Sequence, residues 1–269
     1  MNYSQIASRV EEIAHEAGQL ILTMGQSITQ ADVEIKGLHN YVTKVDKESE
    51  RLIISRLKEI VDGAGFIAEE GTEERIGERY NWVIDPLDGT TNFIHGVPIS
   101  SVSIALMEGE KVVVGSVYEI NSGESFLAYH NGPALLNGRP IRVSSRDNIH
   151  ETLLATGFPY YDYNLLDPYL ELFRHFMKTT RGLRRLGSAA VDLAWVACGR
   201  FDAFYEYGLN PWDVAAGAFI VERAGGRNSD FGGGSGYIFG RQILSSNAIL
   251  HDEYLRHVQM FFGEKERII

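Results

Sequence analysis

The sequence predicts a layered α/β (α+β) sandwich, in which helices pack against a largely antiparallel N-terminal sheet and a second, mixed sheet. Two helical segments open the chain, a block of short strands follows, and helices then alternate with strands to the C-terminus. This order argues against a simple doubly wound sheet. No internal repeat, low-complexity linker or Pro/Ser-rich boundary interrupts the chain, so we expect a single domain over residues 1–269.

The spacing of apolar residues predicts the elements of the first half. Apolar residues recur every three or four positions over 4–26, which is typical of an amphipathic helix, and a second helix is expected from Thr43 to about Val61. Strands are expected at 66–68, 82–84, 101–107 and 111–118. The last two flank Glu108-Gly109-Glu110, which predicts a hairpin.

The second half predicts shorter strands between helices. Strands are expected at 125–130, 141–144, 152–156, 202–207 and 242–245. Helices are expected at about 164–178, at 188–198, from near Trp212, and at about 248–262.

Composition narrows the class of protein. A hydrophobic content of 44% and a charged content of 23% are those of an ordinary soluble globular protein, and no apolar run is long enough to span a membrane. The N-terminal residues carry acids where an export signal would be basic, and Cys198 is the single cysteine, so we expect a cytoplasmic protein without internal disulfides. The net charge of −11 argues against a nucleic-acid partner.

The stretch WVIDPLDGTTNF, residues 82–93, delivers two carboxylates directly after an apolar run. Pro86 fixes φ and is expected to end the strand at Asp85, with Asp88 three positions later. Two neighbouring carboxylates repel each other unless a cation lies between them. Oxygen ligands without nearby His or Cys favour Mg²⁺, Mn²⁺ or Ca²⁺ over zinc. The structural alternative is a polar turn with Asp88 as a helix N-cap.

Residues 89–92, Gly-Thr-Thr-Asn, resemble a helix start whose free backbone N–H groups could hold a phosphate. Acidic residues also follow or open three other elements. Glu69 and Glu70 follow the strand at 66–68, and Asp213 opens a helix, where a cap is the structural alternative. Asp46 could similarly be the third residue of a capping box begun by Thr43. Acids at the ends of four separate elements together predict one shared metal site.

Two long motifs, WVIDPLDGTTNFIHG and NPWDVAAGAFIVERAGG, resemble the two signatures of the inositol monophosphatase family. This family lies within the magnesium-dependent, lithium-sensitive phosphatases that include fructose-1,6-bisphosphatase. Supporting resemblance in YVTKVD, FIAEEG, GPALLNGRPIRVS and LRRLGSAAVDLAWVACGRFDAFYEYG covers most of the chain. The resemblance implies an αβαβα sandwich, a homodimer, and two or three Mg²⁺ ions per active site, with Mn²⁺ as a possible substitute.

The resemblance also implies roles for individual residues. Metal-binding carboxylates match Glu69, Asp85, Asp88 and Asp213, with the Leu87 carbonyl as a further ligand and Asp46 acting on a third ion through water. Gly89 and Thr90 match the phosphate-binding turn, and Thr90 pairs with Glu69 around the attacking water. Glu206 matches a contact to substrate hydroxyls, and Ser188 and Ala189 match positions beside the sugar or cyclitol ring.

The resemblance implies hydrolysis of an inositol monophosphate, or of a related cyclitol or sugar phosphate, by a water activated by the metal ions. The spacing of Asp85 and Asp88 is one residue longer than the D-x-D pattern of phosphatases with an aspartyl nucleophile, so we expect direct attack by water. Fructose bisphosphate, a nucleotide 3′-phosphate, NADP and histidinol phosphate stay open as substrates, as does a non-catalytic role as a partner-binding regulator. Arg184 and Arg185 are expected near the mouth of the site or a subunit interface, in a structural ion pair or holding a second phosphate.

Overall fold

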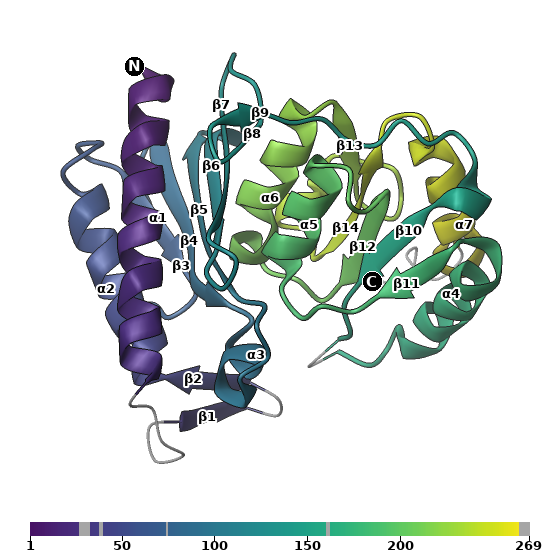
Figure 1. Cartoon of the computed structure of the whole chain (residues 1–269), viewed down its shortest axis with the longest axis horizontal. Helices are drawn as coiled ribbons and strands as arrows, with labels where there is room; N and C mark the ends of the chain where they lie inside the picture. Colours follow the sequence, from purple (N-terminus) through teal and green to yellow (C-terminus); the bar gives the residue numbers. More distant parts are fainter. Residues whose placement is uncertain (27–32, 38–39, 74, 160–161, 264–269) are drawn as a thin grey trace.

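The computed structural model describes residues 1–26, 33–37, 40–73, 75–159 and 162–263, with the backbone alone for 33–37 and 40–42. Five layers succeed one another across the molecule (Figure 1): two helices, a large sheet, two central helices, a smaller sheet and two outer helices. The predicted layered αβαβα sandwich is therefore confirmed.

The helices supply the first, third and fifth layers. Those of the first layer are α1 (Tyr3–Gly25) and α2 (Lys44–Leu57), those of the third are α5 (Ala189–Ala197) and α6 (Pro211–Arg223), and those of the fifth are α4 (Leu166–Thr179) and α7 (His251–Phe262). A short helix, α3 (Thr90–His95), follows the large sheet's second strand. The end of α2 is four residues earlier than the expected end at Val61.

The large sheet is almost entirely antiparallel. Its seven strands are β3 (Gly65–Ala68), β4 (Tyr80–Asp88), β5 (Ser101–Glu108), β6 (Lys111–Glu119), β7 (Glu124–Tyr129), β8 (Leu135–Leu136) and β9 (Arg139–Pro140), paired in that order. Only the pair β3–β4 is parallel. Strands β5 and β6 form the predicted hairpin, with Gly109 at a φ of 59° in its turn. A chain that returns by short turns places sequential strands side by side, so this half folds largely from local pairings.

The smaller sheet is mixed. Its strands lie in the order β11 (Gly182–Arg184), β10 (Leu153–Thr156), β12 (Ala203–Tyr207), β14 (Gln242–Asn247) and β13 (Gly226–Ser229). Strand β10 runs parallel to both β11 and β12, and β14 runs antiparallel to β12 and β13. Separately, β1 (Val33–Gly37) pairs with β2 (Asn40–Thr43).

Two expectations about local structure are wrong. Residues 141–144 form no strand; there the backbone N–H of Val143 donates to the carbonyl of Ala224 instead of joining a sheet. Strand β4 does not end before Pro86 but continues to Asp88 through an irregularity in its register with β5 between Asp85 and Asp88. Proline removes one ladder donor, and a bulge at that point lets the strand continue without it.

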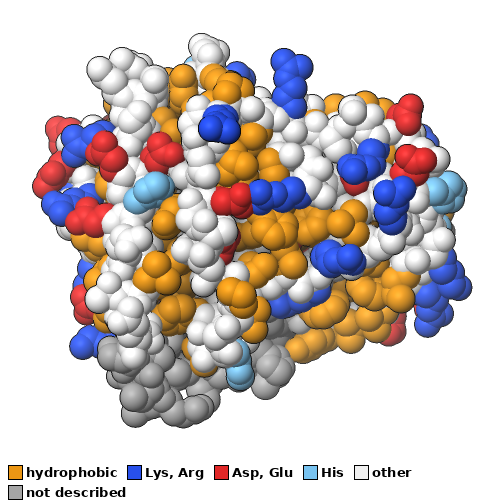
Figure 2. All heavy atoms as spheres, viewed as in Figure 1, with side chains coloured by type: hydrophobic (Ala, Val, Ile, Leu, Met, Phe, Trp, Pro, Cys, Tyr) orange, Lys and Arg blue, Asp and Glu red, His pale blue; other side chains and the backbone are white. Residues whose placement is uncertain are grey.

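The outer face of α1 and α2 is polar, and Figure 2 shows acidic and basic side chains intermixed there. Arg56 of α2 and Glu16 of α1 form an ion pair with N–O distance 2.7 Å. Both helices cover the large sheet, and the inner face of α1 is apolar, whereas that of α2 also carries buried polar residues. Within the described ranges, no helix is long and apolar enough to cross a membrane.

The central helices pack very closely against the large sheet, because small residues face each other there. A Cβ atom added to Gly115 of β6 would lie 2.9 Å from the carbonyl oxygen of Ala216 in α6. Asp213 lies in the first turn of α6, so the distance of this helix from the sheet fixes the position of that carboxylate. The packing of β6 on α6 therefore connects the core to the candidate site.

We predict that Gly115→Ala lowers the free energy of unfolding by about 1–3 kcal/mol, because the added methyl group meets the backbone of α6 and the helix must move. Chemical denaturation measures the change. Gly182→Ala is the control, since its nearest neighbours are side-chain atoms at 3.4 Å and beyond. Equal stabilities of wild type and Gly115→Ala would contradict this account of the packing.

Candidate active site

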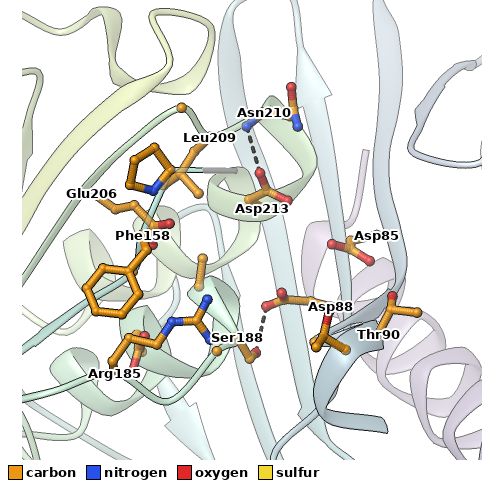
Figure 3. A pocket seen from close by; sticks show the side chains of 18 of the residues that line it. Asp85, Asp88, Thr90, Phe158, Arg185, Ser188, Glu206, Leu209, Asn210 and Asp213 are labelled. Carbon is orange, nitrogen blue, oxygen red and sulfur yellow. Dashed lines mark hydrogen bonds between the residues drawn. The ribbon is translucent and has the colours of Figure 1, made fainter. Parts of the chain in front are cut away.

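A single cavity between the large sheet and the central helices gathers most of the predicted site (Figure 3). Ten of the eleven predicted site residues line it, and Asp46 is the exception. The lining residues from the prediction are Glu69, Asp85, Leu87, Asp88, Gly89, Thr90, Ser188, Ala189, Glu206 and Asp213. They come from five separate segments of the chain, which the fold brings to one place.

The irregular end of β4 carries Asp85 and Asp88 into this cavity. The carboxylate of Asp85 accepts a hydrogen bond of 3.0 Å from the backbone N–H of Leu87, which tightens the turn. From α2, the Ser49 hydroxyl donates to the carbonyl of Pro86 at 3.0 Å. The bulge is thus held from both sides, and this explains why β4 can deliver two acids three positions apart to the same cavity.

Asp88 connects the large sheet to α5. Its Oδ2 accepts hydrogen bonds from the Ser188 hydroxyl at 2.6 Å and from the backbone N–H of Ala190 at 2.8 Å. Burial raises the pKa of Asp88 to about 6, although these two bonds lower it. The alternative that Asp88 caps the following helix is wrong, because Gly89 is the N-cap of α3, with φ 91°.

Glu69 and Asp85 are crowded together. Each of the two carboxyl groups alters the pKa of the other. Burial raises the pKa of both well above the ordinary range, and repulsion from neighbouring carboxylates, Asp213 for Glu69 and Glu69 for Asp85, raises it further. Such crowding indicates a site that favours neutralisation of its negative charge.

Asp213 fills the structural role that the sequence offers as its alternative, and it also lines the cavity. Its Oδ2 accepts from the backbone N–H of Asn210 at 2.7 Å, which completes a capping box at the start of α6. Burial, and then repulsion from Asp88, raise the pKa of Asp213 to about 7. A cap and a cavity carboxylate are compatible because a carboxylate has two oxygens.

Asp46 reaches the cavity only through Thr90. It is the predicted third residue of the capping box begun by Thr43 at the start of α2. Its Oδ1 accepts from the Thr90 hydroxyl at 2.9 Å, and that hydroxyl also lies 3.0 Å from the carbonyl oxygen of Leu87. Burial raises the pKa of Asp46, and the hydrogen bonds from Thr43 oppose this. A hydroxyl has one proton, which Thr90 donates to Asp46 or to the carbonyl of Leu87. The lone pairs of its oxygen can then accept a further hydrogen bond.

The wall opposite Asp85 contains two buried acids, Glu206, which the sequence analysis predicted, and Asp192, which it did not. Glu206 of β12 and Asp192 of α5 are buried there, and burial raises the pKa of each well above its ordinary range. Arg185 lines the same wall, with its guanidinium 5.5 Å from the ring centre of Phe158, and lowers the pKa of both acids. Arg184 is exposed and does not line the cavity. A signal for Asp192 existed: it is the one acid in the apolar run of α5, Ala-Ala-Val-Asp-Leu-Ala-Trp-Val-Ala.

The donor set fits hard divalent cations. Among the described residues that line the cavity, six are acidic and one, Arg185, is basic. Within the same described ranges, no three acidic, histidine or cysteine side chains are arranged to coordinate one metal ion. Oδ2 of Asp88 and Oδ2 of Asp213 accept instead from the hydrogen-bond donors described above. Oxygen ligands in excess of nearby positive charge still match Mg²⁺ or Mn²⁺ and match zinc poorly.

Comparison with known proteins decides the family. The family model described as "Inositol monophosphatase family" matches residues 2–260. The chain belongs to the inositol monophosphatase family. The expected family membership is therefore confirmed, and the match includes every residue that lines the cavity.

Relatives of this inositol monophosphatase family member include proteins named as enzymes and proteins named as Nus factors. The chain is 35% identical over 260 residues to an inositol-1-monophosphatase of Mesorhizobium japonicum, covering 96% of this chain and 98% of the relative. It is 41% identical over 251 residues to the Nus factor SuhB of Pseudomonas aeruginosa, covering 91% and 93%. A crystal structure of the extragenic suppressor protein suhB from Bartonella henselae has a TM-score of 0.90 at 35% identity, covering 95% of this chain and 98% of that one.

The raised pKa of Asp213 gives a test in the metal-free protein. Folding raises this pKa from an ordinary value of 3.8 to about 7, so the folded state binds the proton more tightly than the unfolded state. The contribution of Asp213 to stability therefore falls as the pH rises from about 4 to 7. With a chelator at pH 8, Asp213→Asn should raise the free energy of unfolding by about 2 kcal/mol, discounted from ~1.4 kcal/mol per pKa unit because the cavity is open to water.

Denaturation of wild type and Asp213→Asn at pH 4 and pH 8 measures this difference. The two proteins should be nearly equal at pH 4, where the carboxyl group is protonated in the folded state. The exposed Asp62→Asn serves as the control and should change neither value. An Asp213→Asn protein that is less stable than wild type at pH 8 would contradict the predicted repulsion.

Proposed function

We propose that the chain is a Mg²⁺-dependent phosphomonoesterase that hydrolyses an inositol monophosphate, or a related cyclitol or sugar phosphate, to the alcohol and phosphate. The observation that carries this proposal is the convergence of Glu69, Asp85, Asp88 and Asp213 on one cavity beside the start of α3. Membership of the inositol monophosphatase family supports the reaction class.

We propose that these four carboxylates, with the carbonyl of Leu87, hold two or three divalent cations. When bound, the ions would neutralise the phosphate ester and lower the pKa of the attacking water. Asp46 is proposed to act from behind Thr90, as the hydrogen bond between them allows.

The protein's own groups are proposed to orient the attacking water and the phosphate. The Thr90 hydroxyl donates to Asp46 or to the carbonyl of Leu87, so its oxygen can accept a hydrogen bond from a water. Glu69 is proposed to accept the second hydrogen bond of that water. The backbone at Gly89 and Thr90 opens α3, where no side chain forms a cap hydrogen bond, and N–H groups at such a position suit a phosphate oxygen. None of these residues needs to form a covalent bond to phosphorus.

The opposite wall is proposed to bind the alcohol. Glu206 is 6% exposed and its carboxylate lies so close to Gly157 that a Cβ atom there would be 2.0 Å from Oε2. Glycine at 157 therefore makes room for Glu206, whose oxygens can accept from ring hydroxyls. Ser188 and Ala189, at the start of α5, are proposed to lie beside the ring.

A second candidate function follows from the relatives named Nus factor SuhB. Such names favour a partner-binding role that does not depend on turnover. The two candidates are separable, since a partner-binding surface has no need of six acids in one cavity. Phosphate release with and without Mg²⁺, followed by a ranking of phosphorylated substrates by kcat/KM, tests the enzymatic proposal.

We predict that Asp88→Asn abolishes turnover and leaves the fold intact. The change removes one charge from the proposed cation site, and we expect a loss of at least about 10³-fold in kcat/KM for the ester, on the scale of several kcal/mol of transition-state stabilisation. Phosphate release in saturating Mg²⁺ measures it, with circular dichroism as the test of folding. The exposed Asp252→Asn on α7 is the matched control. Near-wild-type turnover by Asp88→Asn would exclude the proposed site.

A separate prediction concerns the choice of substrate. Glu206→Ala should lower kcat/KM for an inositol phosphate by about 5- to 150-fold, because one lost hydrogen-bonding partner costs roughly 1–3 kcal/mol. A small aryl phosphate, which lacks ring hydroxyls, should lose much less. The exposed Glu222→Ala at the end of α6 should affect neither substrate. Equal losses on both substrates would assign Glu206 a structural role.

A further inference from the structure

Helix α2 has an unusual buried face. One turn of it carries three polar residues, Asp46, Ser49 and Glu50, each at most 1% exposed. Asp46 accepts from Thr90, and Ser49 donates to the carbonyl of Pro86. Two of these three residues therefore contact segments of the candidate site.

Glu50 contacts the turn that follows β3. Its Oε2 accepts from the backbone N–H of Glu70 at 2.8 Å, and its Oε1 accepts from the backbone N–H of Thr72 at 2.7 Å. Gly71, which lies between them, has a φ of 62°, a conformation that glycine adopts readily in a tight turn. Glu69 directly precedes these residues, and its own N–H donates to the carbonyl of Ile84 in β4.

A completely buried carboxylate is costly unless its oxygens are satisfied. Glu50 does not line the cavity, so its two bonds to backbone N–H groups are the observed reason for its presence. Both bonds fix the conformation of the chain within three residues of Glu69. The helix thereby holds the Glu69 turn in the same way that it holds the Asp85–Asp88 bulge through Ser49.

We propose that Glu50 is a positioning residue that holds the Glu69 carboxylate in place for divalent-cation binding by clamping the backbone of residues 70–72. The inference rests on the proposed function, since it assigns Glu69 to the cation site. It is more specific than a general contribution to stability, because both bonds of Glu50 go to the turn beside Glu69.

Glu50→Gln tests the clamp with a nearly isosteric side chain. Glutamine keeps one acceptor oxygen but places an NH₂ group against the second backbone N–H, so one of the two bonds is lost. We expect the dissociation constant for Mn²⁺, measured by electron paramagnetic resonance without substrate, to rise by roughly 10-fold, the lower end of the usual effect of removing an outer partner of a metal ligand. Hydrogen exchange of the Glu70 and Thr72 amides should become faster.

Two controls separate positioning from stability. Glu48→Gln removes the same charge from the half-exposed face of α2, and Ile53→Val weakens the buried face of the same helix without touching the turn. Neither should change the Mn²⁺ affinity. Unchanged affinity in Glu50→Gln, or an equal loss in Ile53→Val, would overturn the inference while the proposed function stands. A wild-type protein that binds no Mn²⁺ would overturn both.

A measurement on the wild type covers the case in which Glu50→Gln does not fold. If the turn at 70–72 favours cation binding, then cation binding must stabilise that turn by the same coupling free energy. Saturating Mn²⁺ should therefore slow hydrogen exchange at the Glu70 and Thr72 amides by severalfold more than at amides of α7. Exchange at the turn that is unaffected by Mn²⁺ would contradict the proposal.

Discussion

The repulsion among buried carboxylates is the constraint on which the rest of the structure depends. Burial alone raises the pKa of each acid in the cavity, and the neighbouring charges raise those of Glu69, Asp85 and Asp213 further. Left to themselves these acids would move apart or take up protons. The fold prevents separation, because each carboxylate is attached to a regular element near the point where that element begins or ends. Bound protons or cations must then neutralise the negative charge of these carboxylates.

This constraint explains the polar interior around the site. Helix α2 anchors the acid-bearing segments of the large sheet through Ser49 and Glu50, and the start of α5 holds Asp88 through Ser188 and Ala190. Helix α6 holds Asp213 by its own capping box and is kept close to the sheet by the absence of a side chain at Gly115. Groups that satisfy a local structural need thus also fix the geometry of the cavity. A carboxylate with two oxygens can serve both purposes.

Much of this arrangement could be predicted from the sequence, because it is local. The 3.6-residue spacing located α1 and the apolar runs located β3 and β4, while the capping box at Thr43 and Asp46 was read directly from its residues. The two long motifs and the shorter supporting ones together predicted ten residues that line one cavity. What failed depended on contacts distant in sequence: β4 continues past Pro86 because Ser49 of α2 supports its bulge, and short edge strands such as β11 carry too few residues for a pattern. The role of Glu50 needs the position of a turn some twenty residues away, which no local pattern contains.

We propose that the acid that follows β3 and the acids of β4 and of the first turn of α6 form one cation site. Anomalous diffraction from crystals of the wild-type protein grown with Mn²⁺ tests it most directly, because the signal locates each ion independently of activity. We expect two or three ions inside the cavity, in contact with Glu69, Asp85, Asp88 and Asp213. Crystals of protein that hydrolyses a phosphate ester in Mn²⁺, yet with no anomalous peak among these carboxylates, would contradict the account.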